Sequence, residues 1–592
     1  MRVRAKIVAA AMIAAVLEVA PVAAGLAIPG TMTASVSPAS VRFGSTTRVA
    51  GVLDTEAVCR PARDVGIEFR TGDASPWAPV TTTTTAAGGA FDAAVAVEEI
   101  GQLRAVAAPA SRDSVDCEES VSDPIPIEVR AAVSASLSRS RLPAGGCARL
   151  TIGVVPPKPA TIVTVERRTS TGWLDVTTKV LDDASTAVVS RCHGWSSIGR
   201  TWTLRATWAG DDHQAAAVSP RVALTVVKAG WMKRIDEAVA GHGMSLSVRD
   251  GGSYLYRWDD RRARVPASNE KLLLSMALLE ALGPATRLPL RAAATSFQEG
   301  AVGNLWLLGD GDPGVRGATL RRLAGRLAEA GLKRVRGRVL GATTPFARDW
   351  FAPGWKRSFP REHVALPTAL TFRGNEADGR HISDPERRAA TAMTRILRER
   401  GIRVAGRPGA GSPPSGLLDV GSVASPTMET LLGQTNRVSS NFFAEVLGKR
   451  LGLNDFGVPG TISRGARGIE AWVAAQGFGV TANDASGLSY DNRISAAVLA
   501  KLLGVAEGQA WGGALRRSLA SAGHGTLRDR LDGVRIRAKT ATLTRISALS
   551  GYVWLERTGS WAEFSILSRG ITKTTAVRIE DRVVRILNRS GR

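Results

Sequence analysis

The first 230 residues consist mostly of short runs in which apolar and polar residues alternate. Such runs occur at 67–71, 80–82 and 165–169, and Gly, Pro, Ser and Asp residues separate them. Alternation with a period of two is typical of half-buried β-strands, and the intervening residues are typical of turns. This part of the chain is therefore predicted to be all-β.

An internal repeat with a period near 100 residues runs through the same region. Two copies of about 100 residues, each with several short strands, are typical of immunoglobulin-like β-sandwiches. We expect one sandwich at 31–130 and a second at 131–229. The matching segments are 67–71 with 165–169, Trp77 with Trp173, and 103–105 with 204–206.

The pattern changes at residue 231, and helical periodicity appears. Residues 231–239 predict an amphipathic helix, two strands follow at 245–248 and 254–256, and 272–282 predict a strongly apolar helix that ends at Gly283-Pro284. The chain closes with predicted strands at 548–554 and 564–567 and a helix near 576–588. Residues 231–592 are expected to form one α/β domain, with inserted subdomains of unresolved topology at about 285–430.

The amino terminus has the pattern of a secretory signal. Arg2, Arg4 and Lys6 precede an apolar run at 7–17, and small residues follow at 23–27. The run is too short for the ~20 apolar residues that span a bilayer. Residues 1–27 are therefore predicted to be a cleaved signal peptide, and the mature protein is expected outside the cytoplasm, in the cell wall or a periplasm-like space.

All four cysteines precede residue 230, two in each predicted sandwich. An exported chain can keep disulfides. Four cysteines allow three connectivities, and pairing within each sandwich favours Cys59–Cys117 and Cys147–Cys192. Free structural thiols are the alternative.

The charge is unevenly distributed along the chain. Residues 31–230 hold 20 basic and 20 acidic side chains, so nearly all of the net charge of +24 lies after residue 230. A basic domain outside the cytoplasm can attract anionic wall polymers or the membrane surface. A compositional preference for arginine is the alternative, and nucleic acid is not an expected partner of an exported protein.

The first candidate for chemistry is Ser268-Asn269-Glu270-Lys271, at the start of the apolar helix. Side chains at i and i+3 share a helix face, so the Lys271 amine can reach the Ser268 hydroxyl. A partly desolvated lysine can act as the base that a serine nucleophile needs. Alone, this spacing has little specificity.

Two further motifs support it. Ser439-Ser440-Asn441 offers a second hydroxyl and an amide, and Lys539-Thr540-Ala541-Thr542 precedes an apolar strand, where an extended peptide can pair by strand addition. Three motifs in this order resemble the serine acyltransferases that bind penicillin.

The flanking segments narrow the resemblance. Together with the three motifs they resemble the D-alanyl-D-alanine carboxypeptidase/endopeptidase family, peptidase family S13, which comprises the class C low-molecular-mass penicillin-binding proteins. The resemblance covers about 231–592 and includes a long insertion between the first two motifs. The segments are 265–271, 309–313, 352–355, 436–445, 484–489 and 547–553.

The family implies a transpeptidase-like fold, in which helices flank an antiparallel sheet, and an exported enzyme that cleaves D-Ala-D-Ala bonds of peptidoglycan stem peptides. Ser268 would be the acylated nucleophile, Lys271 its base, and Ser439 the proton donor to the leaving group. Asn441 would hold the acyl-side amide, Lys539 and Thr540 the terminal carboxylate, and the backbone N–H groups of Ser268 and Thr542 the oxyanion. β-Lactams would be covalent inhibitors, and no metal or organic cofactor is implied.

Three departures from the family pattern bear on activity. Ala541 stands where the family has Gly, and its methyl group could crowd the substrate. Ser440 replaces Asp in the second motif. The segment 341–346 lacks the acidic residues linked in the family to reading the free amino end of the stem peptide.

Competing sites are weakly supported by the sequence. It has no Gly-x-Ser-x-Gly elbow, no His-Glu-x-x-His spacing, and no histidine pair at metal-ligand spacing. Two alternatives to a peptidase stay open: a wall-binding protein that keeps the fold with little or no catalysis, and a hydrolase of β-lactams or esters. The sandwiches are expected to be spacers, or to bind the wall or another protein.

Overall fold

The computed structural model describes residues 26–590, so the predicted signal peptide lies outside the described residues except for its last two positions. The chain divides into two compact units. The first holds most of the described residues up to 225, and the second holds the rest together with two loops at 142–146 and 192–200. The chain therefore enters the second unit three times, which a single boundary near 230 does not capture.

In the first unit, each half of the repeat contains a three-stranded sheet. The two sheets pair their strands in the same order, first, second and third along the chain. In both sheets the first and second strands are antiparallel. The strands are β2 (Thr31–Ser37), β4 (Thr46–Asp54) and β7 (Ala90–Ala96) in one copy, and β13 (Ala132–Leu137), β15 (Cys147–Val155) and β18 (Thr186–Cys192) in the other.

A second set of antiparallel strands repeats as well. The central strand of each set pairs with one strand on either side. Separate apolar cores fill the two copies, one built around Val49, Ile67 and Leu103 and the other around Ile152 and Val163. The strands are β6 (Ala78–Thr84), β5 (Asp64–Arg70) and β8 (Gly101–Ala107), then β17 (Trp173–Val180), β16 (Ile162–Arg168) and β19 (Thr201–Gly210).

The repeat extends to a stack of side chains. Arg104 forms an ion pair with Glu68 and lies 4.3 Å from the ring centroid of Trp77. The second copy holds the same arrangement in Arg205, Glu166 and Trp173. The predicted β repeat is confirmed at the level of its strands and pairing, while its assignment to the immunoglobulin-like class stays a prediction.

The predicted disulfide pairing is also confirmed. Cys59 and Cys117 are bonded, with 5.7 Å between their Cα atoms. Cys147 and Cys192 are disulfide-bonded too, which leaves them only each other as partners.

An antiparallel five-stranded sheet forms the centre of the second unit. Its order is β23-β22-β39-β38-β37, so β37 lies at an edge. The first two strands turn through Gly251 and Gly252, both of which have positive φ. The four predicted strands are confirmed as β22 (Met244–Asp250), β23 (Ser253–Trp258), β38 (Ile546–Leu555) and β39 (Ser560–Arg569). The sequence analysis placed the third motif in front of a strand, whereas in the structure the motif itself lies on a strand, β37 (Ile536–Leu543).

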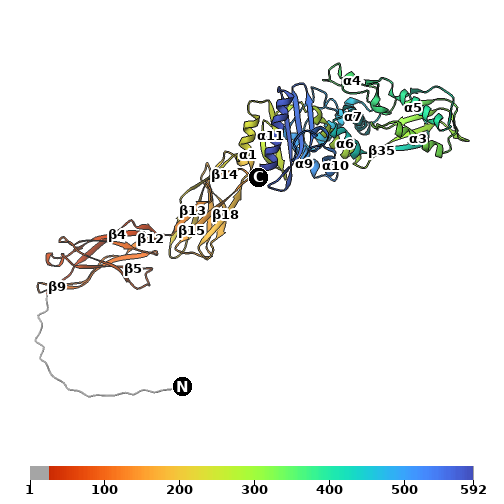
Figure 1. Cartoon of the computed structure of the whole chain (residues 1–592). Helices are drawn as coiled ribbons and strands as arrows, with labels where there is room; N and C mark the ends of the chain where they lie inside the picture. The colour runs from red at the N-terminus through yellow and green to blue at the C-terminus, as the bar shows by residue number, and fades with distance from the viewer. Residues whose placement is uncertain (1–25, 591–592) are drawn as a thin grey trace, which may run out of the picture. The chain divides into compact units, whose positions relative to one another are not determined.

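Helices cover both faces of this sheet (Figure 1). On β38, Ser547 and Tyr552 lie on opposite faces because strand side chains alternate. Ser547 donates a hydrogen bond to Glu580 on α11 (Lys573–Ser590), which packs beside α1 (Gly230–Val239). Tyr552 donates to the Leu503 carbonyl on α9 (Ala496–Glu507), so α9 covers the other face.

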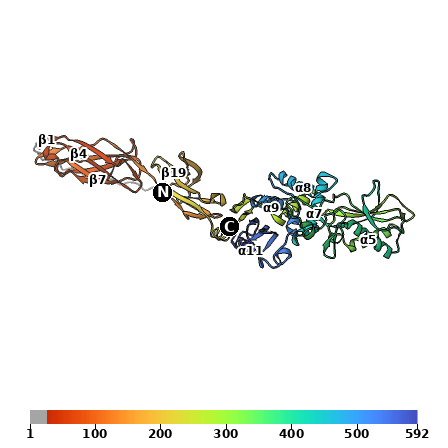
Figure 2. The ribbon, with the colours of Figure 1, turned by 90° about the horizontal axis from the view of Figure 1, so that it is seen from above.

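A cluster of helices adjoins the sheet and encloses α2 (Glu270–Leu282). Leu272, Leu274 and Met276 on α2 are all fully buried, so this helix is apolar on every side and lies inside the core. Among the described residues, no helix is both long and apolar enough to cross a membrane. The surrounding helices are α6 (Met428–Arg437), α7 (Asn441–Phe456), α8 (Ile462–Ala475) and α10 (Gly512–Ser518), and Figure 2 shows α7 beside α8.

The segment that the sequence left unresolved forms a separate layer with its own core. Its main sheet has the order β34-β30-β28-β25-β35, and α3 (Gly317–Glu329) and α5 (Pro385–Glu399) connect its three parallel strands. The strands are β25 (Arg287–Ala294), β28 (Leu305–Gly309), β30 (Val339–Ala342), β34 (Gly409–Gly411) and β35 (Leu418–Thr427).

Removing the first disulfide should destabilise the first unit selectively. The bond closes a loop across a sequence separation of 58, and a loop of that size corresponds to about 4 kcal/mol of unfolding free energy in the chain-entropy model. Calorimetry of the full chain should show the first unit of the Cys59→Ser/Cys117→Ser variant melting earlier while the second unit is unchanged. A single unshifted profile would contradict this.

Candidate active site

Ser268 lies at the junction between a short 3₁₀ turn, Ala267–Asn269, and α2. Ala267 is fully buried and has φ of 47°, a left-handed conformation that an alanine rarely adopts. Such strain is held only where surrounding packing dictates it, and it occurs often at functional sites. The strained residue places the half-buried Ser268 hydroxyl at the amino end of α2.

Lys271 is fully buried, and its amine has three neighbours. Its Nζ is 3.2 Å from Ser268 Oγ and 2.9 Å from Asn441 Oδ1, and it also donates to the Ser486 carbonyl oxygen. The predicted contact between the first serine and the first lysine is therefore present in the structure. Asn441 joins the two motifs directly.

Burial lowers the pKa of Lys271 to about 8, because the charged form loses its hydration. Asp484, Glu445 and Glu270 act in the opposite direction through their negative charges. A lysine with a pKa near neutrality is partly uncharged at physiological pH, which a general base requires.

A second serine and lysine face the same region. Lys539 is fully buried and donates to Ser439 Oγ at 2.8 Å and to the Thr540 carbonyl oxygen at 2.7 Å. Burial, and next the charge of Lys271, holds the pKa of Lys539 well below its usual value. Ser439 has φ of 59°, so this serine too is held in a strained conformation.

The second motif continues into a helix cap. Ser440 precedes α7, and its hydroxyl accepts a hydrogen bond from the Phe443 amide at 3.2 Å. Serine and aspartate are both strong helix N-caps, which explains why Ser440 can replace the family's aspartate. Asn441 is the first helical residue, and its Nδ2 donates to the His363 carbonyl oxygen.

The third motif lies on the edge strand β37. Among the described residues, a backbone bridge covers its outer side only at Ala538, where it meets Ala520, so the positions after that can accept another strand. Ala541 is 4% exposed and packs in the core cluster opposite Ala548. Ala541 also lines the active-site cavity between these elements, so the expected crowding of a substrate by its methyl group stays a prediction.

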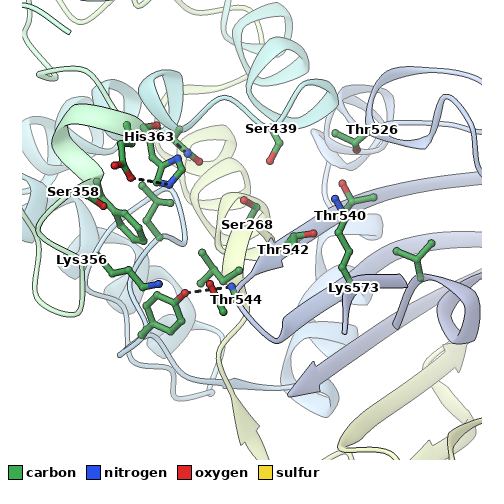
Figure 3. Close-up of a pocket in the computed structure, with 18 of the residues that line it drawn as sticks. Ser268, Lys356, Ser358, His363, Ser439, Thr526, Thr540, Thr542, Thr544 and Lys573 are labelled. Carbon is green, nitrogen blue, oxygen red and sulfur yellow. Dashed lines mark hydrogen bonds and ion pairs between the residues drawn. The ribbon is translucent and has the colours of Figure 1, made fainter. Parts of the chain in front are cut away.

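A cavity of about 730 Å³, here named the Ser268 cavity, opens between these elements. Ser268, Ser439, Asn441, Thr540 and Thr542 line it, and Figure 3 shows four of them around the same space. The side chains of Lys271 and Lys539 lie behind it and reach it through the two serines. All seven residues proposed from the sequence thus meet at one place.

The sequence analysis did not assign several other residues of this cavity. Lys356 and His363 lie on one side of the cavity in Figure 3 and Thr526 on the other. Tyr490 lines it too, with its ring centroid 5.3 Å from Lys356 Nζ. The Thr526 hydroxyl is buried without a hydrogen-bond partner. These residues belong to no short motif, so only the folded chain identifies them.

Two buried acidic residues, Glu445 and Asp484, hold the loop that contacts Lys271. Glu445 accepts hydrogen bonds from the backbone amides of Ala485 and Ser486, and this fixes the carbonyl group to which Lys271 donates. Burial raises the pKa of Glu445 to about 8. Asp484 accepts from the Gly487 and Ser489 amides and from the Trp355 indole nitrogen.

Gly487 lets this loop approach the nucleophile. It has φ of +80°, and a Cβ atom there would lie 1.9 Å from the Ala267 carbonyl oxygen and 3.0 Å from the Ser268 amide nitrogen. Only glycine fits at this position.

Within residues 26–590, no three His, Cys, Asp or Glu side chains form a group that could hold a metal ion. The expectation that the enzyme needs no metal stays a prediction.

A serine beside a buried lysine, with a second serine–lysine pair and a free strand edge, has the arrangement of a serine acyl-transfer enzyme. The model of the D-Ala-D-Ala carboxypeptidase 3 (S13) family matches residues 233–378 and 365–590. The chain belongs to this family, which confirms the resemblance seen in the sequence.

Characterised relatives agree with this assignment. The chain is 27% identical over 456 residues to D-alanyl-D-alanine carboxypeptidase of Actinomadura sp. strain R39, covering 60% of this chain and 83% of that protein. It is 28% identical over 366 residues to carboxypeptidase DacB of Mycolicibacterium smegmatis, covering 56% and 77%. The crystal structure of penicillin binding protein 4 from Haemophilus influenzae shares the fold, with a TM-score of 0.54, 16% identity, and coverage of 60% and 99%.

Changing Gly487 to alanine should disable the nucleophile without changing any catalytic side chain. The new methyl group must displace Ala267 and Ser268, and a misplacement of about 1 Å can lower a rate by about 10²-fold. The rate at which Ser268 reacts with benzylpenicillin, followed by mass spectrometry, measures the effect.

Gly479→Ala is the matched control, because a Cβ atom at Gly479 meets nothing within 4 Å. Equal rates in the two variants would show that the close approach of Gly487 is not needed.

Proposed function

We propose that this protein is an exported serine D-alanyl-D-alanine carboxypeptidase, with DD-endopeptidase action on D-amino-acid cross-links, that acts on peptidoglycan stem peptides. The observation that carries the proposal is the contact of Lys271 Nζ with Ser268 Oγ, Asn441 Oδ1 and the Ser486 carbonyl oxygen. Family membership supports the reaction class.

The three contacts of Lys271 explain how it acts as a base. An uncharged amine has two hydrogens and one lone pair. Asn441 Oδ1 and the Ser486 carbonyl can only accept, so they take both hydrogens. The lone pair is then directed at the Ser268 hydroxyl, which donates its proton to Lys271 as Oγ attacks the scissile carbonyl.

The substrate is expected to pair with β37 as an added antiparallel strand. The backbone N–H groups of Ser268 and Thr542 would stabilise the oxyanion, and the Asn441 amide would hold the acyl-side peptide group. The terminal carboxylate would bind near Thr540, with Lys539 supplying positive charge from behind. The unpartnered Thr526 hydroxyl is a further donor at that end.

Release of the leaving group needs a proton on its nitrogen. In this proposal Ser439 donates its own proton and then takes up the one that Lys271 accepted from Ser268, so that Lys271 is uncharged again. Lys539, whose Nζ lies 2.8 Å from Ser439 Oγ, orients that hydroxyl. Water then attacks the ester on Ser268; Lys271 accepts the proton of the water and passes it to Ser268 Oγ as the ester bond breaks. The products are the shortened peptide and D-alanine or, when a cross-link is cleaved, two separate stem peptides.

The intact mass of residues 28–592 with and without benzylpenicillin tests the nucleophile. We expect a stable gain of one equivalent that is absent in Ser268→Ala and retained in Ser358→Ala, a serine that lines the same cavity. An adduct that survives in Ser268→Ala would overturn the assignment.

Assays of the same protein with a D-Ala-D-Ala peptide and a chromogenic cephalosporin, together with the penicillin experiment, separate the alternatives. Turnover of a D-Ala-D-Ala peptide that depends on Ser268 supports the peptidase. Fast hydrolysis of a chromogenic cephalosporin would favour a β-lactam hydrolase. Unmodified protein and intact penicillin would favour the binding protein.

Acylation should depend on pH through Lys271. The base must be uncharged, so activity is present above its pKa of about 8 and is lost as the pH falls through that value. The second-order rate of penicillin acylation should fall about tenfold per pH unit on the acid side and level off on the alkaline side. A flat profile between about pH 6 and about pH 9 would contradict Lys271 as the base.

A further inference from the structure

A second cavity, of about 800 Å³, lies in the inserted segment and shares no lining residue with the Ser268 cavity. We name it the arginine cavity. Its walls come from helix α3, strand β35, the start of β25 and the residue after α5. Its charged residues are Arg287, Arg321, Arg322, Arg326, Arg400 and Glu329.

Most of this positive charge is not neutralised by the protein. Glu329 pairs with Arg326 at 3.0 Å, and it is the only acidic residue of the lining. Arg287 donates to the Ser425 carbonyl oxygen, which carries no net charge. The side chains of Arg321 and Arg400 make no hydrogen bond or ion pair in the described part of the chain. Arg322 interacts electrostatically with Asp312. Three guanidinium groups of this concave surface, those of Arg287, Arg321 and Arg400, therefore have no acidic partner among the described residues, and such a surface concentrates anions.

The basic surface continues toward the active site. A third cavity, of about 620 Å³, shares Arg321 with the arginine cavity and adds Arg316 and Arg373. Its lining also includes Ser440 and Phe442, which flank Asn441 of the second motif. Glu376 is the one acidic residue there. The two cavities together are larger than a single small anion needs, and they lead from the inserted segment to α7.

Guanidinium groups recognise oxyanions through paired N–H donors. A tetrahedral phosphate offers oxygens in several directions, so arginines from three walls can bind one group, whereas a carboxylate offers two oxygens in one plane. We propose that the arginine cavity binds a phosphodiester polymer of the cell envelope and thereby holds the enzyme next to its insoluble substrate.

The test is binding of the full mature chain to end-labelled poly(glycerol phosphate), measured by fluorescence anisotropy. The variant Arg321→Ala/Arg322→Ala/Arg400→Ala removes three charges from the cavity, and it should weaken binding by at least about tenfold. The control Arg578→Ala/Arg582→Ala/Arg589→Ala removes the same charge from the exposed side of α11, and it should weaken binding by less than about threefold. Equal losses would show general attraction to a basic protein and overturn the proposal.

Two further arms identify the ligand. Poly-L-glutamate of equal length should bind more weakly and respond equally to both triple variants; cavity-dependent binding as tight as that of the phosphate polymer would overturn the phosphate assignment. Vesicles containing phosphatidylglycerol should not compete with the polymer at equal phosphate concentration. Competition that depends on the cavity would assign it to lipid headgroups.

The variants can be checked for intact folding without assuming this role. Penicillin acylation of Ser268 should be the same in both triple variants, since none of the substituted residues lines the Ser268 cavity. If the alanine variant loses acylation, Arg321→Lys/Arg322→Lys/Arg400→Lys keeps the charge but loses the paired donors, and it should still bind the phosphate polymer several-fold more weakly than the parent. Unchanged affinity in that variant would overturn the proposal.

Discussion

The active site depends on one buried lysine, Lys271, whose pKa is lowered far enough for part of it to be uncharged. A buried ammonium group is costly, and burial lowers the pKa of Lys271 to about 8. Its two acceptors come from distant parts of the chain, Asn441 on α7 and the Ser486 carbonyl in the loop after α8. Both acceptors must be held in place for the lone pair of Lys271 to face Ser268. The helices packed around α2 hold them there.

The rigidity of this support is visible in residues that take no part in the chemistry. Gly487 packs against the carbonyl of the strained Ala267, Glu445 fixes the Ser486 backbone, and Asp484 ties the same loop to Trp355. Lys539 is a second buried lysine at the same cavity. Burial and the charge of Lys271 lower its pKa. Lys271 and Lys539 thus both have a lowered pKa, and each is hydrogen-bonded to a serine of the cavity.

The remaining parts of the chain differ in how they relate to this centre. Among the described residues, the first unit repeats a sheet and an Arg–Trp stack. The inserted segment has its own core and adds arginine-lined surface that continues to α7. The attachment to the envelope that we propose would therefore use a different layer from the one that holds Ser268.

The sequence by itself determined the repeat, the disulfide pairing, the helix and strands that bound the second unit, and the family, because these depend on local periodicity and short motifs. It also brought together Ser268, Lys271, Ser439, Asn441, Lys539, Thr540 and Thr542 through the resemblance. Only the tertiary structure decided the topology of the inserted segment, whose parallel strands pair across long connections. It alone showed that Glu445, Gly487 and Thr526 belong to the site. Burial and close approach are properties of the packed chain, and no spacing along the sequence encodes them.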